Sequence, residues 1–254
     1  MKKFKGFTTG GIIASIIVIA LVIIAGFIVT DRSNKATDYN KYDFTKIISA
    51  DEHNGNIGDH VKGNKDAKVV IVEYADFQCE YCALMNPRVN KLVEELGDKV
   101  AVVYRNFLLS YHQNGTAAAS AAEAAGLQGY WKEYSDLLFN NQSEWYYSSG
   151  SERTALFNKY FEEASNGKGD LDKFNEDIAS EAVSKKISFD MGIGQRVDIT
   201  GTPSFYIDGQ KFEFGNANGG SFTVNGTTLS WSQPLSNSEF NEYLKKIVEL
   251  KLAE

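Results

Sequence analysis

The first hydrophobic feature of the chain is an uncharged, apolar run over residues 12–29, which three lysines precede. At a rise of about 1.5 Å per residue, a helix of this length spans about 27 Å, close to the hydrocarbon thickness of a bilayer. Lysines before such a run favour a cytoplasmic N-terminus. We therefore predict a cytoplasmic segment over residues 1–11, a transmembrane anchor over 12–29 and an extracellular body. The alternative is a cleaved signal peptide, although its apolar core is usually shorter and ends in a small-x-small site.

The rest of the chain divides into a polar stretch and a patterned one. Residues 30–62 are mostly polar and show no clear period, which predicts a tether and an irregular lead-in. Residues 63–254 carry the patterns of a folded domain, and within them residues 112–190 contain Ala-rich and amphipathic helical stretches with no strand pattern. We predict a helical subdomain inserted into a domain that otherwise alternates strands and helices.

Strand and helix patterns alternate at the start of this domain. Lys68 to Tyr74 form a β-branched run with one acid inside it, which is typical of a strand buried on both faces. Apolar residues then recur at steps of three and four as far as Gly97, which predicts a helix with Cys79 at its N-terminus. Val100 to Phe107 and Ser204 to Asp208 have strand patterns. Together these elements predict an α/β fold that begins with a right-handed βαβ unit.

The C-terminal part has clear turn and cap signals. Asn225-Gly226 is the signature of a type I′ hairpin, and Ser236 with Glu239 predicts a capping box that opens a final helix. Residues 214–234 form a long connection before this helix. The sequence offers two interpretations of this connection, a decoration or a partner-binding flap, and no physical reason to choose between them.

The charge of the chain restricts its partners. The net charge is −7, and without the three N-terminal lysines 23 basic residues face 33 acidic ones, so the body carries −10. An acidic, well-solvated body argues against nucleic acid or anionic lipid headgroups as partners.

Cys79 and Cys82 are the two cysteines of the chain and lie three positions apart. Residues three apart on a helix share one face, so the sulfurs can bond, and the helix N-terminus stabilises a thiolate at Cys79. We predict disulfide exchange in which Cys79 attacks and Cys82 resolves. The alternatives are half of a zinc site and an inert structural disulfide. A second ligand pair is missing and the three histidines are scattered, so we predict no metal and no cofactor beyond the cysteine pair.

Two further residues carry alternative interpretations. Glu73 lies inside an apolar strand, where a carboxylate is costly unless it is used or paired. It is either a buried acid with a raised pKa that exchanges a proton with Cys82, or a glutamate on an edge strand that faces water. Pro203 follows Gly201-Thr202 and precedes a strand, and spacing alone is also consistent with a proline that starts an edge strand.

From about Gly63 onward, the chain resembles the DsbA-like branch of the thioredoxin superfamily, especially its membrane-tethered, Gram-positive-type oxidoreductases. The resemblance rests on these motifs: Gly63-Asn64-Lys65-Asp66-Ala67, the strand with Glu73, Asp76-Phe77-Gln78-Cys79-Glu80-Tyr81-Cys82, Pro87, Tyr104-Arg105-Asn106-Phe107, the Ala-rich helices and Gly201-Thr202-Pro203. It implies a thioredoxin-like sandwich with an inserted helical subdomain. It also implies that Pro203 is cis beside the cysteines, that the Thr202 backbone pairs with an extended substrate, and that Glu73 is the family's buried acid.

The sequence departs from this family between the cysteines, where many relatives have proline and this chain has Glu80-Tyr81. We expect Glu80 to raise the pKa of Cys79 by Coulomb repulsion, which would make the disulfide less oxidising. The resemblance implies an extracellular oxidase that introduces disulfides into exported cysteine-containing proteins through a mixed disulfide at Cys79, with a membrane quinone-linked partner. The alternatives are a disulfide reductase or isomerase, and a tethered binding module with a structural disulfide.

Overall fold

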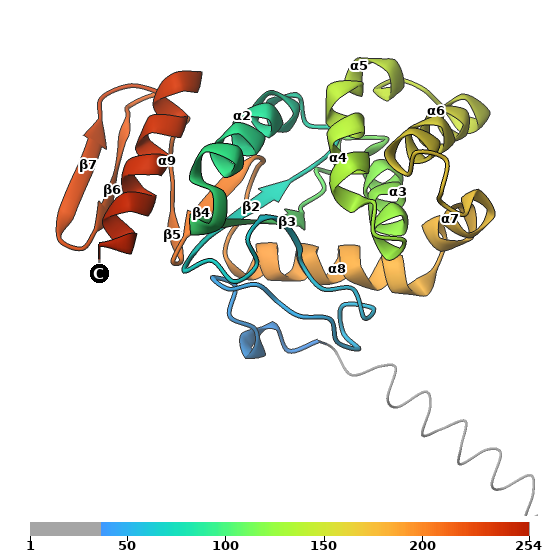
Figure 1. Ribbon diagram of the computed structural model, residues 1–254, viewed down its shortest axis with the longest axis horizontal. Helices are drawn as coiled ribbons and strands as arrows, with labels where there is room; N and C mark the ends of the chain where they lie inside the picture. The colour runs from blue at the N-terminus through green and yellow to red at the C-terminus, as the bar shows by residue number, and fades with distance from the viewer. Residues whose placement is uncertain (1–36, 254) are drawn as a thin grey trace, which may run out of the picture. The chain divides into compact units, whose positions relative to one another are not determined.

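The computed structural model describes residues 37–253, and the predicted cytoplasmic segment and anchor lie outside these residues. Residues from Tyr39 onward form one compact unit (Figure 1). Within residues 37–253, none of the helices combines the length and the hydropathy that a membrane crossing requires.

The centre of this unit is a five-stranded mixed sheet in the order β1-β3-β2-β4-β5. The strands are β1 (His60–Gly63), β2 (Val69–Ala75), β3 (Val100–Asn106), β4 (Ser204–Ile207) and β5 (Gln210–Lys211). β2 and β3 are parallel, whereas the other three pairs are antiparallel. β2 therefore lies at the centre of the sheet, and all seven of its residues are buried, as the β-branched run predicts.

Helices cover both faces of the sheet (Figure 1). On one face, α2 (Glu80–Leu96) and α9 (Asn237–Leu252) pack on side chains such as Val69 and Ile71. On the other face, α8 (Glu181–Arg196) packs on the alternate positions Val70 and Val72. Because side chains alternate along a strand, Glu73 shares the α2 face with Ile71.

Six helices lie between β3 and β4, where the sequence predicts a helical insertion over residues 112–190. They are α3 (Gly115–Leu127), α4 (Trp131–Asn140), α5 (Gln142–Trp145), α6 (Gly150–Ala164), α7 (Leu171–Ile178) and α8. All alanines of α3 except the partly buried Ala117 are buried among aromatic residues of α4, α6 and α7. α8 extends beyond the predicted end of the insertion, because its second half packs on the sheet through Phe189 and Ile193.

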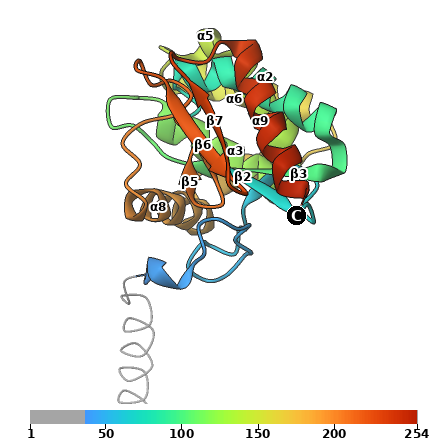
Figure 2. The same cartoon turned by 90° about the vertical axis from the view of Figure 1, so that its left-hand side faces the viewer.

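A two-stranded hairpin stands beside α9 (Figure 2). It consists of β6 (Gly220–Val224) and β7 (Thr227–Trp231), joined at Asn225 and Gly226, which have φ of 50° and 72°. These positive values are those of a type I′ turn, so the Asn-Gly prediction is confirmed. The predicted capping box at Ser236 is also present. Phe222, Val224 and Trp231 anchor the hairpin in the core beside α9.

The described part of the predicted tether and lead-in is irregular over most of its length, as expected, but it is packed on the domain, so the tether prediction is wrong there. The chain is packed from Tyr39 onward, through the short helix η1 (Tyr39–Lys41), and Ile48 and Ile57 are buried. A buried ion cluster contributes to this packing; we call it the Asp59 cluster, and it consists of Asp59, Arg105, Lys186 and Asp190. Arg105 also donates hydrogen bonds to the carbonyl oxygens of Phe44 and Lys46, which hold the lead-in against β3.

Candidate active site

The two cysteines lie where β2 ends and α2 begins. Cys79 is the N-cap residue of α2; its N–H donates to the Asp76 carbonyl at 3.0 Å, and its own carbonyl accepts from the Ala83 N–H at 3.1 Å. Cys82 lies in the first turn, and both residues are free thiols. Cys79 is 5% exposed and Cys82 is 0% exposed. Cys79 is thus the more exposed of the two residues, but only by this small margin.

The surroundings shift the two thiol pKa values in opposite directions. The pKa of Cys79 is lowered to about 6, chiefly by a hydrogen bond from the Cys82 thiol, with contributions from the backbone amides of Cys82 and Tyr81. The pKa of Cys82 is raised well above its usual value, chiefly by burial and then by the Cys79 sulfur. The pair therefore favours a thiolate at Cys79 and a neutral thiol at Cys82, which suits an attacking and a resolving sulfur.

The loop before β4 lies directly against Cys79. The Thr202–Pro203 peptide bond is cis, as the resemblance implies and spacing alone left open. The Sγ of Cys79 donates to the Thr202 carbonyl oxygen at 3.4 Å. Ser204 Oγ donates to the Gly201 carbonyl at 2.8 Å and closes the loop on itself. The predicted residue Thr202 therefore contacts the Cys79 sulfur through its carbonyl oxygen, and Pro203 follows it in the same loop.

Glu73 is a buried carboxyl group in the central strand of the sheet. It pairs with Tyr104 of β3 on one side and with Phe205 of β4 on the other, so the edge-strand interpretation is wrong. Burial raises the pKa of Glu73 to about 7; Lys62 opposes this rise and the charge on Cys79 adds to it. Glu73 in turn helps to raise the pKa of Cys82. Such a group can exchange a proton near neutral pH.

A buried lysine whose charge acts on Glu73, Lys62, was not predicted from the sequence. The Nζ of Lys62 donates to Asn86 Oδ1 at 2.6 Å, to Asn90 Oδ1 at 2.9 Å and to Asp136 Oδ1 at 2.9 Å. Burial lowers the pKa of Lys62, while Asp136 acts against this shift. Lys62 therefore places a positive charge near Glu73 that is itself fixed by α2 and α4.

The dipeptide between the cysteines behaves differently from the prediction. Glu80 and Tyr81 both face solvent, and Tyr81 is 71% exposed. The net shift of the Cys79 pKa is downward, opposite to the rise expected from Glu80. The physical reason is that solvent screens an exposed carboxylate, whereas the hydrogen bonds to the sulfur act at close range.

Buried amide side chains hold the active-site turn against the helical insertion, and no local sequence pattern indicates them. Gln142 Nε2 donates to the carbonyl oxygens of Phe77 at 2.7 Å and of Cys79 at 3.1 Å. Gln78 Nε2 donates to the Tyr146 carbonyl at 2.9 Å. Asn114 Nδ2 donates to the same Tyr146 carbonyl at 3.0 Å. The insertion therefore fixes the backbone around Cys79.

The histidines do not gather into a metal site. His60 and His112 contact Glu123 and Asp76, respectively, at 2.7 and 2.8 Å. Within residues 37–253, no three histidine, cysteine or carboxylate side chains are grouped as ligands for a metal ion.

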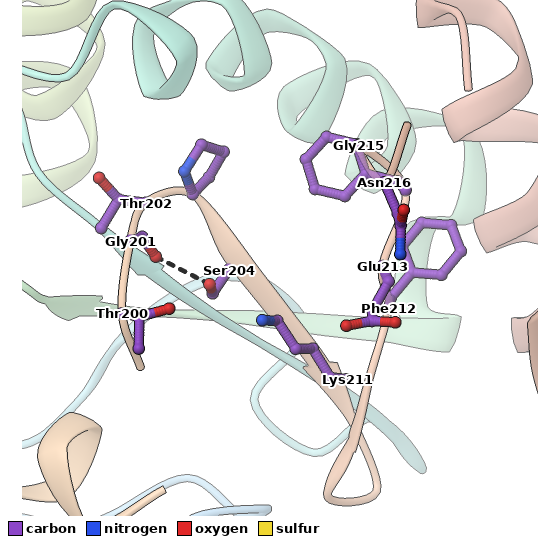
Figure 3. A pocket seen from close by; sticks show the side chains of 11 residues that line it. Thr200, Gly201, Thr202, Ser204, Lys211, Phe212, Glu213, Gly215 and Asn216 are labelled. Atoms are coloured by element: carbon purple, nitrogen blue, oxygen red, sulfur yellow. Dashed lines mark hydrogen bonds between the residues drawn. The ribbon is translucent and has the colours of Figure 1, made fainter. Parts of the chain in front are cut away.

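Two hollows flank the Pro203 loop. The apolar groove, of about 460 Å³, is lined by Tyr81, Leu84, Met85, Arg88, Pro203, Phe214, Gly215, Pro234, Leu235, Ser236, Asn237 and Phe240. The loop pocket, of about 300 Å³, lies between residues 200–204 and residues 211–216 (Figure 3). Both hollows share Pro203, Phe214 and Gly215, so they meet at the loop that contacts Cys79.

Comparisons with known proteins agree with this geometry. The family model described as thioredoxin matches residues 55–245. Among solved structures, alpha-DsbA1 of Wolbachia pipientis is 22% identical, with a TM-score of 0.54 over 77% of this chain and 93% of that one. BdbD of Bacillus subtilis is 17% identical, with a TM-score of 0.53 over 82% of this chain and 100% of that one. At these identities the likeness concerns the fold.

The curated relatives are longer proteins. A Na(+)/H(+) antiporter, NhaA 3 of Salinispora tropica, is 36% identical over 154 residues, which are 60% of this chain and 22% of that protein. A second, NhaA 1 of Salinispora arenicola, is 35% identical over the same shares. The chain thus spans about a fifth of the length of the curated relatives it matches.

The family match and the cysteine geometry lead to one assignment. The matched residues include both cysteines, Glu73 and Pro203, and the fold that carries them is that of DsbA-like proteins. The predicted resemblance is confirmed, as is the thioredoxin-like part of the predicted fold class. The chain therefore belongs to the thioredoxin family.

Proposed function

We propose that this chain is a thiol-disulfide oxidoreductase, and specifically a dithiol oxidase that introduces disulfides into exported proteins. The observation that carries the proposal is the low pKa of Cys79, about 6, beside a Cys82 whose pKa is raised. A stabilised thiolate favours the reduced form of the pair and therefore makes its disulfide oxidising. The expectation that Glu80 would weaken this tendency is not supported, because the net shift is downward.

The proposed reaction moves two electrons from a substrate dithiol to the Cys79–Cys82 disulfide. A substrate thiolate attacks Cys79 Sγ, which forms a mixed disulfide and releases Cys82 as a thiolate. Glu73, with a pKa of about 7, supplies the proton that Cys82 takes up. The second substrate thiolate then attacks the substrate sulfur of the mixed disulfide and releases Cys79, which leaves readily because its own pKa is low.

The location and partners belong to the same proposal. The apolar run over residues 12–29 and the lysines before it support a single-pass anchor with the catalytic unit outside the cell. An oxidase there needs an acceptor for two electrons per turnover, for which we propose a quinone-linked membrane protein. The acidic body supports protein substrates over nucleic acid.

The reduction potential of the full-length chain tests the direction of electron flow. We expect a value near that of a strong oxidant, about −120 mV, rather than the value of about −270 mV typical of thioredoxin. Equilibration with glutathione buffers followed by alkylation and mass analysis measures it. A potential as low as that of thioredoxin would favour a reductase or isomerase and overturn the oxidase proposal.

Trapping of thiols in cells tests direction and location together. One sample is quenched with acid before alkylation, which reports the redox state of Cys79, and another is treated as intact cells with a membrane-impermeant maleimide. We expect Cys79 to be mostly oxidised, and reachable by the maleimide only after mild reduction of the intact cells. A mostly reduced Cys79, or one shielded by the membrane, contradicts the proposal.

The Cys79→Ala variant separates an oxidase from a binding module with a structural disulfide. Loss of substrate oxidation, with folding retained, supports redox chemistry at Cys79. Unchanged function in this variant would support the binding module.

A further inference from the structure

The loop pocket arises because two antiparallel segments separate beside Cys79. The last ladder contact between them is the Phe212 N–H, which donates to the Phe205 carbonyl at 2.8 Å. The Phe214 N–H then bonds back to the Phe212 carbonyl at 3.0 Å, and the Phe214 carbonyl accepts from Leu235 at 2.8 Å. Since Phe214 uses both backbone groups elsewhere, the segment turns away from the Pro203 loop and leaves space for another chain.

Lys211 projects into this space without an acidic partner. Figure 3 shows its side chain reaching from its own strand towards the Thr200–Ser204 loop. Among residues 37–253, no carboxylate forms an ion pair with Lys211, and Asp208 of the adjacent turn pairs with Lys251 instead. Lys211 is half-buried, whereas Glu213, which also lines the pocket, is exposed. The lysine charge is therefore the less screened of the two.

We propose that the loop pocket is a substrate subsite in which Lys211 binds the carboxylate of a glutamate or aspartate close to the reacting cysteine. This inference rests on the proposed function and names the class of its substrates: exported chains with an acidic residue on one side of the cysteine. The carboxylate of the acidic residue forms an ion pair with Lys211 Nζ and accepts a hydrogen bond from it. Lys211 thus determines specificity and takes no part in the bond exchange.

The position of the loop pocket beside Cys79 indicates that a substrate chain occupies it. Thr202 lines the pocket and its carbonyl contacts Cys79 Sγ at 3.4 Å, so any chain joined to Cys79 by a mixed disulfide passes over this wall. The pocket continues into the apolar groove at Pro203 and Phe214. An extended segment spaces alternate side chains by about 7 Å, so residues flanking one cysteine reach both hollows. One side of the cysteine meets apolar surface, and the other meets Lys211.

Matched dithiol peptides test the subsite. The peptides differ in one residue, Glu, Gln or Lys, placed two positions before or two positions after the first cysteine. The measurement is the second-order rate constant for reduction of the Cys79–Cys82 disulfide in the full-length oxidised chain. We expect the Glu peptide to react about three- to fivefold faster than the Lys peptide, on one side of the cysteine only. The ratio should fall towards one in high salt.

Charge variants decide whether Lys211 is responsible. K211E should reverse the preference, K211Q should remove it, and E213Q should strengthen it. K168Q is the matched control, because Lys168 is an exposed lysine in the α6–α7 connection, and it should keep the wild-type preference. Thermal unfolding checks that each variant is folded.

The outcomes separate this inference from the proposed function. Equal rates for Glu and Lys peptides, or an unchanged preference in K211E, would overturn the subsite and leave the oxidase intact. A shift in K168Q as large as that in K211Q would mean that overall charge governs the rates, which also overturns the subsite. Failure of every peptide to reduce the disulfide would contradict the oxidase itself.

Discussion

Two buried carboxyl groups, Glu73 and Asp59, lie on opposite faces of the same sheet, and their pKa values shift in opposite directions. Glu73 of β2 faces α2, and burial raises its pKa to about 7. The Asp59 cluster lies on the α8 face; there Arg105 and Lys186 contact Asp59 at 2.7 and 3.2 Å. These cations outweigh burial and hold the pKa of Asp59 below its usual range.

The difference shows that burial alone does not define the role of a carboxyl group. Asp59 has two cations in direct contact, so it stays ionised and binds the lead-in to the sheet. The charge of Lys62 also acts on Glu73, but the Nζ of Lys62 donates its hydrogen bonds to Asn86, Asn90 and Asp136 instead. A carboxyl group left without a direct ion pair titrates near neutral pH, which makes it available for proton exchange.

The largest effect is expected from breaking the Asp59 cluster. Arg105→Met leaves the Asp59 carboxylate buried with one of its two cations and removes the bonds to Phe44 and Lys46. We expect the free energy of unfolding to fall by about 3–5 kcal/mol in urea titrations. The pKa of Cys79 should stay near 6, because the cluster lies on the far face of the sheet. A shift of that pKa together with the stability would show that the two sites are coupled.

Glu73→Gln should raise the free energy of unfolding, whereas Arg105→Met should lower it. A raised pKa in the folded state means that the wild-type group has no effect on stability below its unfolded value of about 4.5 and destabilises increasingly as pH rises to 7. Removing it should raise the free energy of unfolding by about 3 kcal/mol above pH 7 and leave it nearly unchanged at about pH 4. Urea unfolding of both proteins across this range gives the difference. Substrate oxidation by the variant should be slower and lose its pH dependence near 7; a constant stability difference would contradict a titrating Glu73.

Lys62→Met should produce the smallest change. Lys62 lowers the pKa of Glu73. Its removal should therefore shift the pH range over which ionisation of Glu73 lowers the free energy of unfolding upwards, by about one pH unit at its upper end. Lys132→Met is the matched control, since Lys132 contacts the same Asp136 at 3.6 Å from an exposed position. Equal shifts in both variants would assign the effect to Asp136 rather than to Lys62.

Local signals explain what the sequence could predict. The strand before Cys79, the helix that begins there and the Asn225-Gly226 turn each depend on neighbours within a few positions, and the structure contains all three. The cis bond at Pro203 came from the family resemblance, because no local pattern distinguishes it from an edge-strand proline.

Contacts between distant parts of the chain explain what the sequence could not predict. Lys62 meets Asp136, 74 positions away, and Gln142 meets Cys79, 63 positions away. Neither lysine nor glutamine is unusual in its own stretch of sequence. The prediction for the lead-in was wrong for the same reason. Its polar residues are typical of a solvated segment, but Arg105, 61 positions from Phe44, binds the Phe44 carbonyl and holds the segment on the domain.

The two outer strands of the sheet have a consequence for aggregation. Exposed strand edges can pair with other extended chains, which leads to aggregation. Here β5 has two residues and β1 has four, and β1 turns the charged Lys62 inwards. A foreign strand added at β1 would lie beside a strand with a buried ammonium group, so this edge discourages polymerisation.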